Sequence, residues 1–289
     1  LSRGLGDVYK RQMHYTQIGN DFVYASEIKS ILEYPKFEKK FNRKALDSYL
    51  SFQYAVPPET FFEGVYCLMP GHYLWYKDGE VETTRYFEAR FNPDEEMTEE
   101  EAVDRIEKVF ENSVNAHKIA DVEVGCFLSS GVDSSYVAAV ANVDKTFTVG
   151  FGEDEKYNEI GYAKEFSKYI NKENFSKVIS PEEYWNSLSK IQYHMDEPLA
   201  DPAAVALFFV CQIASEKVKA VLSGEGADEI FGGYNIYHNP ADMASYFKIP
   251  RPIRKAVGAV AEKLPHKHGI NYLIRGSKDL DERFIGNAY

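Results

Sequence analysis

Two short segments hold most of the residues whose types and spacing could do chemistry. The first, Ser129-Ser130-Gly131-Val132-Asp133-Ser134, lies between two apolar runs. Small residues let an anion approach the backbone, Gly131 adds conformational freedom, and N–H groups at a helix start favour phosphate. Asp133 would repel phosphate unless a divalent cation lay between them. The segment predicts a phosphate site with a metal ion, and its lack of lysine excludes a Walker A loop. A plain helix cap is the alternative.

The second segment runs from Ser223 to Tyr234 and contains four glycines and three carboxylates within twelve residues. The carboxylates are Glu225, Asp228 and Glu229. Clustered carboxylates repel one another, and glycines lose much conformational entropy on folding, so the loop is costly for a purely structural role. A cation or a polar substrate would relieve the repulsion. A flexible acidic turn is the alternative.

The elements around these segments alternate between strand and helix. We expect strands at 122–128, 146–151, 175–179 and 218–222, and helices at 134–142, 158–169, 181–193 and 203–215. This order favours an α/β fold with a doubly wound parallel sheet, in which ligands bind beyond the carboxyl ends of the strands. The loops after Leu128, Phe151 and Leu222 are therefore the expected ligand sites.

Residues 13 to about 90 have mixed β and α character. The runs 73–76 and 81–86 predict a hairpin, and the Asp-Gly pair between them, at positions 78 and 79, favours a type I′ turn. Ser26 is the expected cap of a helix over 27–32, and Asn42 is the expected cap of the next helix. Downstream of a solvated linker, Thr98 and Glu101 have the spacing of a capping box.

Composition limits the remaining classes of function. Lys plus Arg number 33 against 45 Asp plus Glu, and this net charge of −12 argues against a nucleic-acid partner. With 44% hydrophobic residues, the chain of 289 residues is not disordered in bulk. No apolar run approaches the ~18 residues that span a bilayer, and no signal peptide is visible.

The three cysteines, Cys67, Cys126 and Cys211, are too sparse for a disulfide framework or a zinc site. We expect each to serve packing, and a reducing cytosol fits this usage. His194 lies two residues before Asp196-Glu197, where a metal site and a helix-end histidine are the alternatives.

The first segment resembles the pyrophosphate loop of the N-type ATP pyrophosphatases, usually Ser-Gly-Gly-x-Asp-Ser, with Ser130 at the second position. With the second segment, the chain resembles asparagine synthetases of the glutamine-hydrolysing type. Further matches are Phe147-Thr148-Val149-Gly150-Phe151, Tyr157-Asn158-Glu159 and Asp196-Glu197-Pro198, and two stretches that resemble the end of that family's glutaminase domain, Ala25-Ser26-Glu27-Ile28-Lys29 and Pro70-Gly71-His72.

The resemblance implies a fold and its domains. A doubly wound parallel sheet of the ATP-pyrophosphatase (adenine nucleotide α-hydrolase-like) type would follow a partial, mixed α+β N-terminal-nucleophile glutaminase domain. The expected limits are 1–12 for a non-native or disordered segment, 13–90 for the end of the glutaminase domain, 91–100 for the linker and 101–289 for a synthetase domain truncated at its C-terminus.

The resemblance also assigns roles to single residues. The adenine and ribose of ATP would contact the backbone at Leu128, Val149, Ser223 and Gly224. The pyrophosphate would lie on Ser129, Ser130, Gly131 and Ser134. Asp133 and Asp228 would hold Mg²⁺. Glu225 would be the catalytic residue, which helps to form the aspartyl-adenylate or takes a proton from the attacking ammonia.

The activity implied is that of a cytoplasmic ligase of asparagine biosynthesis. It would convert aspartate into asparagine through a β-aspartyl-AMP intermediate, with ATP and with ammonia from glutamine. The glutaminase's N-terminal cysteine is absent from this chain and the family's adenylation lysine has no assignable counterpart, so we expect a fragment without glutaminase activity and with little or no synthetase activity. A β-lactam or lasso-peptide cyclase and a non-catalytic nucleotide-binding fragment are alternatives. Neither nucleic acid nor membrane is an expected partner, and a homodimer of a full-length protein stays open.

Overall fold

The computed structural model describes residues 12–152, 158–198, 200–234, 237, 243–265 and 267–279. The chain divides into two compact units, Leu1–Gly224 and Glu225–Tyr289. The segment expected at 1–12 lies outside the described residues except for Gln12, and so does Tyr157. Among the helices that are described, none combines the length and the apolar character needed to cross a bilayer.

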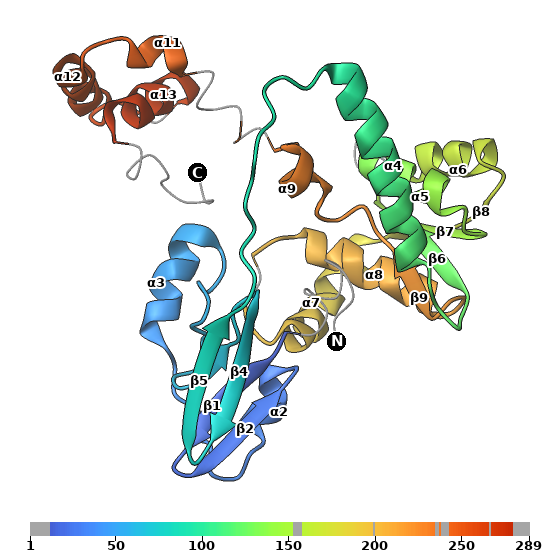
Figure 1. Ribbon diagram of the computed structural model, residues 1–289, viewed down its shortest axis with the longest axis horizontal. Coiled ribbons are helices and arrows are strands. Elements are labelled where there is room, and N and C mark those ends of the chain that lie inside the picture. The colour runs from blue at the N-terminus through green and yellow to red at the C-terminus, as the bar shows by residue number, and fades with distance from the viewer. Residues whose placement is uncertain are drawn as a thin grey trace. The chain divides into compact units, whose positions relative to one another are not determined.

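The first unit begins with small antiparallel sheets. Strands β1 (His14–Ile18), β2 (Asp21–Ala25) and β3 (Tyr66–Cys67) pair in the order β2-β1-β3. Strands β4 (His72–Lys77) and β5 (Glu80–Arg85) form the predicted hairpin, visible as the teal arrows of Figure 1. Both turn residues have positive φ, 53° at Asp78 and 87° at Gly79. This is the backbone that a type I′ turn requires, so the prediction is confirmed.

Two helices accompany these strands, α2 (Ile28–Leu32) and α3 (Arg43–Phe52). Asn42 caps α3 as predicted, because its side chain accepts a hydrogen bond from the Lys44 N–H at 3.1 Å. The cap predicted for the first helix is wrong. The N-cap position of α2 is Glu27 rather than Ser26, and no side chain of the neighbouring sequence caps it. A carboxylate from far along the chain binds its first N–H groups instead, as described below.

The main sheet is parallel and has four strands. They are β6 (Val124–Phe127), β7 (Lys145–Phe151), β8 (Glu173–Ile179) and β9 (Ala220–Leu222), in the spatial order β8-β7-β6-β9. The intervening segments are helical: α5 (Val132–Ala141), α6 (Ile160–Tyr169), α7 (Pro181–Met195) and α8 (Ala203–Ser215). The expected α/β fold with a parallel sheet is confirmed, since parallel neighbours require crossovers of this kind.

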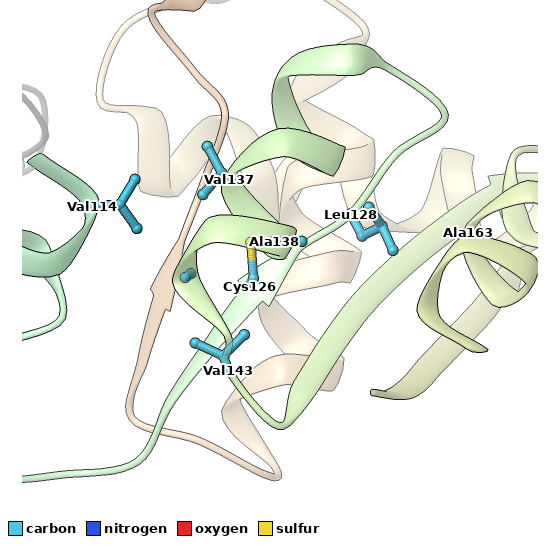
Figure 2. Close-up of a cluster of buried hydrophobic side chains, with 8 residues drawn as sticks. Val114, Cys126, Leu128, Val137, Ala138, Val143 and Ala163 are labelled. Carbon is cyan, nitrogen blue, oxygen red and sulfur yellow. The ribbon is translucent and has the colours of Figure 1, made fainter. Parts of the chain in front are cut away.

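Helices cover both faces of this sheet because successive side chains of a strand point to opposite sides. On one face, Cys126 and Leu128 pack with α5, α6 and α4 (Glu99–His117), as Figure 2 shows. On the other face, Phe147 packs against α8. Helix α4 begins with the predicted capping box, in which Thr98 and Glu101 satisfy each other's backbone N–H at 3.3 and 3.1 Å.

The second unit contains the helices α9 (Ala227–Phe231), α11 (Ala244–Phe247), α12 (Arg251–Ala261) and α13 (His268–Ser277). Helices α12 and α13 pack closely where Gly258 meets Ser277, since a Cβ at Gly258 would overlap the serine side chain. Arg254 of α12 donates a hydrogen bond to the Gly276 carbonyl of α13, which fixes this pairing.

Candidate functional site

The loops after β6 and β9 leave the main sheet from the same edge. Strand β6 has β7 on one side and β9 on the other, and Cys126 of β6 pairs with Leu222 of β9. The chain therefore reverses its direction of travel across the sheet between these two strands. In open α/β sheets, this switch point is where the crevice for a ligand forms. The two segments singled out from the sequence begin on either side of it.

The loop after β6 is closed by its own serines. The Ser129 N–H donates to Ser134 Oγ at 3.1 Å, and the two hydroxyls lie 2.8 Å apart. The Gly131 N–H donates to Ser129 Oγ at 3.1 Å. Ser135 adds a hydrogen bond from its hydroxyl to the Gly131 carbonyl at 2.8 Å. The structure therefore brings four of the predicted phosphate-binding residues together in one turn at the start of α5.

The amide groups of this turn suit an anion. Within the described part of the chain, the N–H groups of Val132, Asp133 and Ser134 have no hydrogen-bond acceptor, as expected for the first turn of a helix. The Ser130 N–H already donates to a carboxylate, that of Glu159, at 3.0 Å. The loop thus binds one anionic oxygen from within the chain and offers further donors beside it.

Gly131 does not use the conformational freedom expected of it. It has φ −74° and ψ 152°, which any residue adopts, so this expectation is wrong. What the glycine provides is space, because a Cβ at this position would lie 3.3 Å from Ser129 Oγ. A side chain there would disturb the serine hydroxyls that close the loop.

Two residues expected near the adenine and ribose are held within the sheet. The Leu128 N–H donates to the Phe147 carbonyl at 2.9 Å, and the Leu128 carbonyl accepts from the buried Thr148 hydroxyl at 2.8 Å. A carbonyl oxygen has two lone pairs, and this hydrogen bond uses one of them. Since strand geometry repeats every two residues, the backbone of Val149 faces the same side as that of Phe147, toward the loop.

Gly224, at the start of the second loop, lies directly against the first. A Cβ on Gly224 would come within 2.8 Å of Ser134 N and 3.0 Å of the Asp133 carbonyl carbon. Such distances are shorter than side chains tolerate, so only glycine allows this approach. The contact joins the two predicted loops at the first turn of α5.

The carboxylates of the second loop gather around one tyrosine. Tyr234 donates a hydrogen bond to Glu229 at 2.9 Å, and this bond, followed by burial, raises the pKa of Tyr234 to about 12. The charges of Glu229, Asp228 and Glu225 contribute to the same rise. Asp228 is packed against Gly233, where a Cβ would overlap its side chain. All three carboxylates of the segment therefore act on Tyr234.

Magnesium fits the donors present. In the described residues, no three His, Cys, Asp or Glu side chains lie close enough to hold a metal ion by themselves. Mg²⁺ is usually bound by one or two carboxylates together with substrate phosphates and water, so a complete protein cage is not needed. Asp133 is exposed at the start of α5, beside the open N–H groups, and offers one such carboxylate.

The cysteines divide into two groups. Burial raises the pKa of the Cys126 thiol to about 12, and burial together with the nearby Glu197 raises that of Cys67 to about 11. Cys126 packs in the core, as expected. Cys211 is exposed on α8, so the packing role expected for it is wrong. The buried face of that helix carries Val205, Phe209, Val210 and Ala214 instead.

Asp196 and Glu197 have a role that the sequence did not reveal. The Asp196 carboxylate accepts from the Ile28 N–H at 2.6 Å, and Glu197 accepts from the Phe61 N–H at 2.7 Å. His194 is the helix-end residue of α7 that one alternative expected, and its ring meets that of Tyr193 at 5.6 Å. The only indication in the sequence was the resemblance of Asp196-Glu197-Pro198 to a family motif. Such a motif does not say which residues its side chains contact.

Comparisons with known proteins divide the chain in two. Residues 105–282 match the family model of asparagine synthase, and residues 7–87 match that of a glutamine amidotransferase domain. The chain is 41% identical to asparagine synthetase [glutamine-hydrolyzing] 1 of Bacillus subtilis, over 96% of this chain and 44% of the relative.

More distant relatives carry two different names. Asparagine synthetase [glutamine-hydrolyzing] 3 of Bacillus subtilis is 28% identical over 88% of this chain and 44% of its own length. Amidase chyE of Penicillium rubens is 27% identical over 90% of this chain and 42% of its own length. The chain thus spans less than half the length of these relatives.

Proposed function

The chain belongs to the asparagine synthase family, and from this premise we propose that it carries the nucleotide site of an ATP-dependent conversion of aspartate into asparagine. One observation carries the proposal. The turn of serines at the start of α5 holds open N–H groups, and Gly224 from the second loop packs directly on it. The relatives named asparagine synthetase favour aspartate as the acid that is activated.

In this proposal, the pyrophosphate part of ATP lies on Ser129, Ser130, Gly131 and Ser134. The open N–H groups at the start of α5 and the helix dipole stabilise its charge. The Ser130 N–H already donates to Glu159, so the open donors for phosphate are the N–H groups of Val132, Asp133 and Ser134. The adenine and ribose lie along the backbone of Leu128, Val149, Ser223 and Gly224.

Asp133 and Asp228 would hold Mg²⁺, whose charge, when the ion is bound, offsets that of the departing pyrophosphate. A carboxylate oxygen of aspartate attacks the α-phosphorus of ATP, and pyrophosphate leaves. Ammonia then attacks the activated carbonyl, so that asparagine forms and AMP leaves. Glu225 would face this carbonyl and accept a proton from the attacking ammonia.

The finer architecture follows the same proposal. We assign the main sheet to the ATP-pyrophosphatase type, residues 13–90 to the end of a glutaminase domain, 91–100 to a linker and 101–289 to the synthetase domain. The match of residues 7–87 to a glutamine amidotransferase domain supports glutamine as the nitrogen source. The pKa values of Cys67 and Cys126 argue against either as its nucleophile. A cytoplasmic location agrees with the sparse cysteines.

The test is the release of pyrophosphate from MgATP by the purified chain. Because little synthetase activity is expected of this chain, we expect slow release that depends on aspartate and ammonia. It should be lost in the Asp133→Asn variant but not in Asp121→Asn, a control at an exposed position. Release with another carboxylic acid in place of aspartate would instead indicate a related adenylating enzyme, such as a β-lactam or lasso-peptide cyclase. Binding of MgATP without release with any acid would reduce the chain to a nucleotide-binding module.

A further inference from the structure

Two adjacent carboxylates at the end of α7 bind the part of the chain that matches an amidotransferase domain. Asp196 accepts from the Ile28 N–H at 2.6 Å and the Lys29 N–H at 3.4 Å. Its carboxylate also lies 2.8 Å from the Lys29 ammonium. These N–H groups open helix α2, which has no cap from its own neighbourhood. Asp196 therefore provides, from 168 positions away, the cap that the local sequence lacks.

Glu197 reaches a second segment of the same region. Its carboxylate accepts from the Phe61 N–H at 2.7 Å. Burial and the adjacent charge of Asp196 raise the pKa of Glu197, and the charge of Glu197 contributes to the raised pKa of the Cys67 thiol. Asp196 also lines a cavity of about 340 Å³, together with Pro198, Phe61 and Phe62.

The backbone at Asp196 is in an unfavourable conformation. Its φ is 63° and its ψ −36°, a region that residues with a side chain rarely adopt. Such strain persists only where surrounding contacts fix the residue. Here those contacts are the two N–H groups of α2 and Lys29, whose ammonium also lies 3.1 Å from Glu27 and 5.3 Å from the centre of the Tyr193 ring.

A merely local or metal-binding role does not account for this arrangement. Two adjacent carboxylates repel each other, and burying them is costly unless each is hydrogen-bonded or paired. No metal-ligand cluster includes them in the described residues, and their oxygens already accept hydrogen bonds from Ile28 and Phe61. Both N–H donors belong to the segment that matches the amidotransferase model, whereas the acceptors belong to the asparagine synthase segment.

We propose that Asp196 and Glu197 form an acidic clasp that fixes the amidotransferase segment in one register on the synthase segment. Asp196 binds the start of helix α2 and Glu197 binds the backbone at Phe61, so together they define an orientation that one contact could not. The consequence for catalysis rests on the proposed function: the clasp positions the source of nitrogen relative to the site where the amide forms. Asp196 and Glu197 are positioning residues in this scheme and do not touch the reactants.

Hydrogen exchange of single amides in the chain tests the clasp through its cross-effects. In Glu197→Ala, the Ile28 and Lys29 amides should exchange at least about tenfold faster, although their own acceptor is intact. In Asp196→Ala, the Phe61 amide should likewise exchange at least about tenfold faster, although its own acceptor, Glu197, is intact. This coupling is expected because the two carboxylates hold one interface. Loss of either contact should therefore open the interface and expose the amides bound by the other. Exchange at Phe147 in the main sheet should not change.

Conservative variants provide the control. Glu197→Gln keeps an acceptor oxygen and should retain slow exchange at all three amides, whereas Asp196→Asn loses the ion pair to Lys29 and should be intermediate. If each alanine variant accelerates only its own partner amide, the residues are two independent caps and the proposal is overturned. The wild-type pyrophosphate assay, run in parallel, decides the proposed function separately. If no pyrophosphate is released, the proposed function fails, and the exchange results still test the acidic clasp on their own.

Discussion

Among single residues, Gly224 constrains the candidate site most tightly. Because a Cβ there would approach Ser134 N to 2.8 Å, Gly224→Ala must move either the second loop or the start of α5. We expect the free energy of unfolding to fall by about 1–3 kcal/mol, with weaker binding of MgATP. Thermal unfolding and titration calorimetry measure both effects.

The matched control is Gly161→Ala in α6. A Cβ at Gly161 would meet nothing within 4 Å, and alanine favours a helix by up to ~1 kcal/mol over glycine. This variant should be as stable as the wild type or more so. If Gly224→Ala is equally harmless, the two loops do not pack as described.

The cysteines give a second prediction at this scale. With pKa values of about 11 and about 12, Cys67 and Cys126 stay protonated near neutral pH, and a thiol reacts only as its thiolate. Maleimide at about pH 8 should therefore modify the exposed Cys211 first. Mass spectrometry of the peptides shows the order in which the cysteines are modified. Modification of Cys126 before unfolding would contradict its burial.

Some residue roles could be predicted from the sequence and others could not. Caps that use neighbouring residues, such as Asn42 and the Thr98 capping box, follow from short-range geometry and are confirmed. The prediction for Ser26 failed because the N–H groups of α2 are bound by Asp196, which no local pattern can indicate. The freedom expected of Gly131 failed because the loop needs its small size rather than a positive φ.

At the scale of elements, helix α7 offers a pH-dependent capping box. Ser180 accepts from the Glu183 N–H at 3.1 Å, and Glu183 accepts from the Ser180 N–H at 3.0 Å. The hydrogen bond from Lys177, then that from Ser180, lowers the pKa of Glu183 from 4.5 to about 2. A lowered pKa stabilises the folded state above pH 4.5, and this contribution is lost as the pH falls toward about 2.

We therefore expect the first turn of α7 to open in that acidic range, before the main sheet does. Amide exchange at Glu183 and Tyr184 should accelerate as the pH falls, after correction for the intrinsic pH dependence of exchange. In Glu183→Gln the acceleration should disappear, because the side chain no longer titrates. Persistence of the pH dependence in that variant would assign it to another group.

The order of elements could be predicted because helical and strand periodicities are local properties of the sequence. Their ends were less predictable. The strand expected at 122–128 spans Val124–Phe127, and the one expected at 218–222 spans Ala220–Leu222. Pairing with a neighbour sets these limits, and the sequence of one strand does not contain its neighbour. The Asp78-Gly79 turn was predictable because its backbone depends on those two residues alone.

At the scale of the whole molecule, the edge that carries the candidate site could also be predicted. Alternating strands and helices imply parallel pairing, and parallel pairing places all loops after strands at one edge. The acidic clasp could not be predicted, since its partners lie 168 and 136 positions apart in the sequence. Contacts at such separations depend on how complete segments pack.

The proposed function depends most on the proposal that Asp133 and Asp228 hold one magnesium ion together with ATP. Titration calorimetry of MgATP against the wild type, Asp133→Asn, Asp228→Asn and the double variant tests it directly. Each single variant should weaken binding at least about tenfold, or about 1.4 kcal/mol, and the double variant should bind no more weakly than the weaker single one, because both remove the same ion. Losses that simply add, or wild-type affinity in either single variant, would contradict the account.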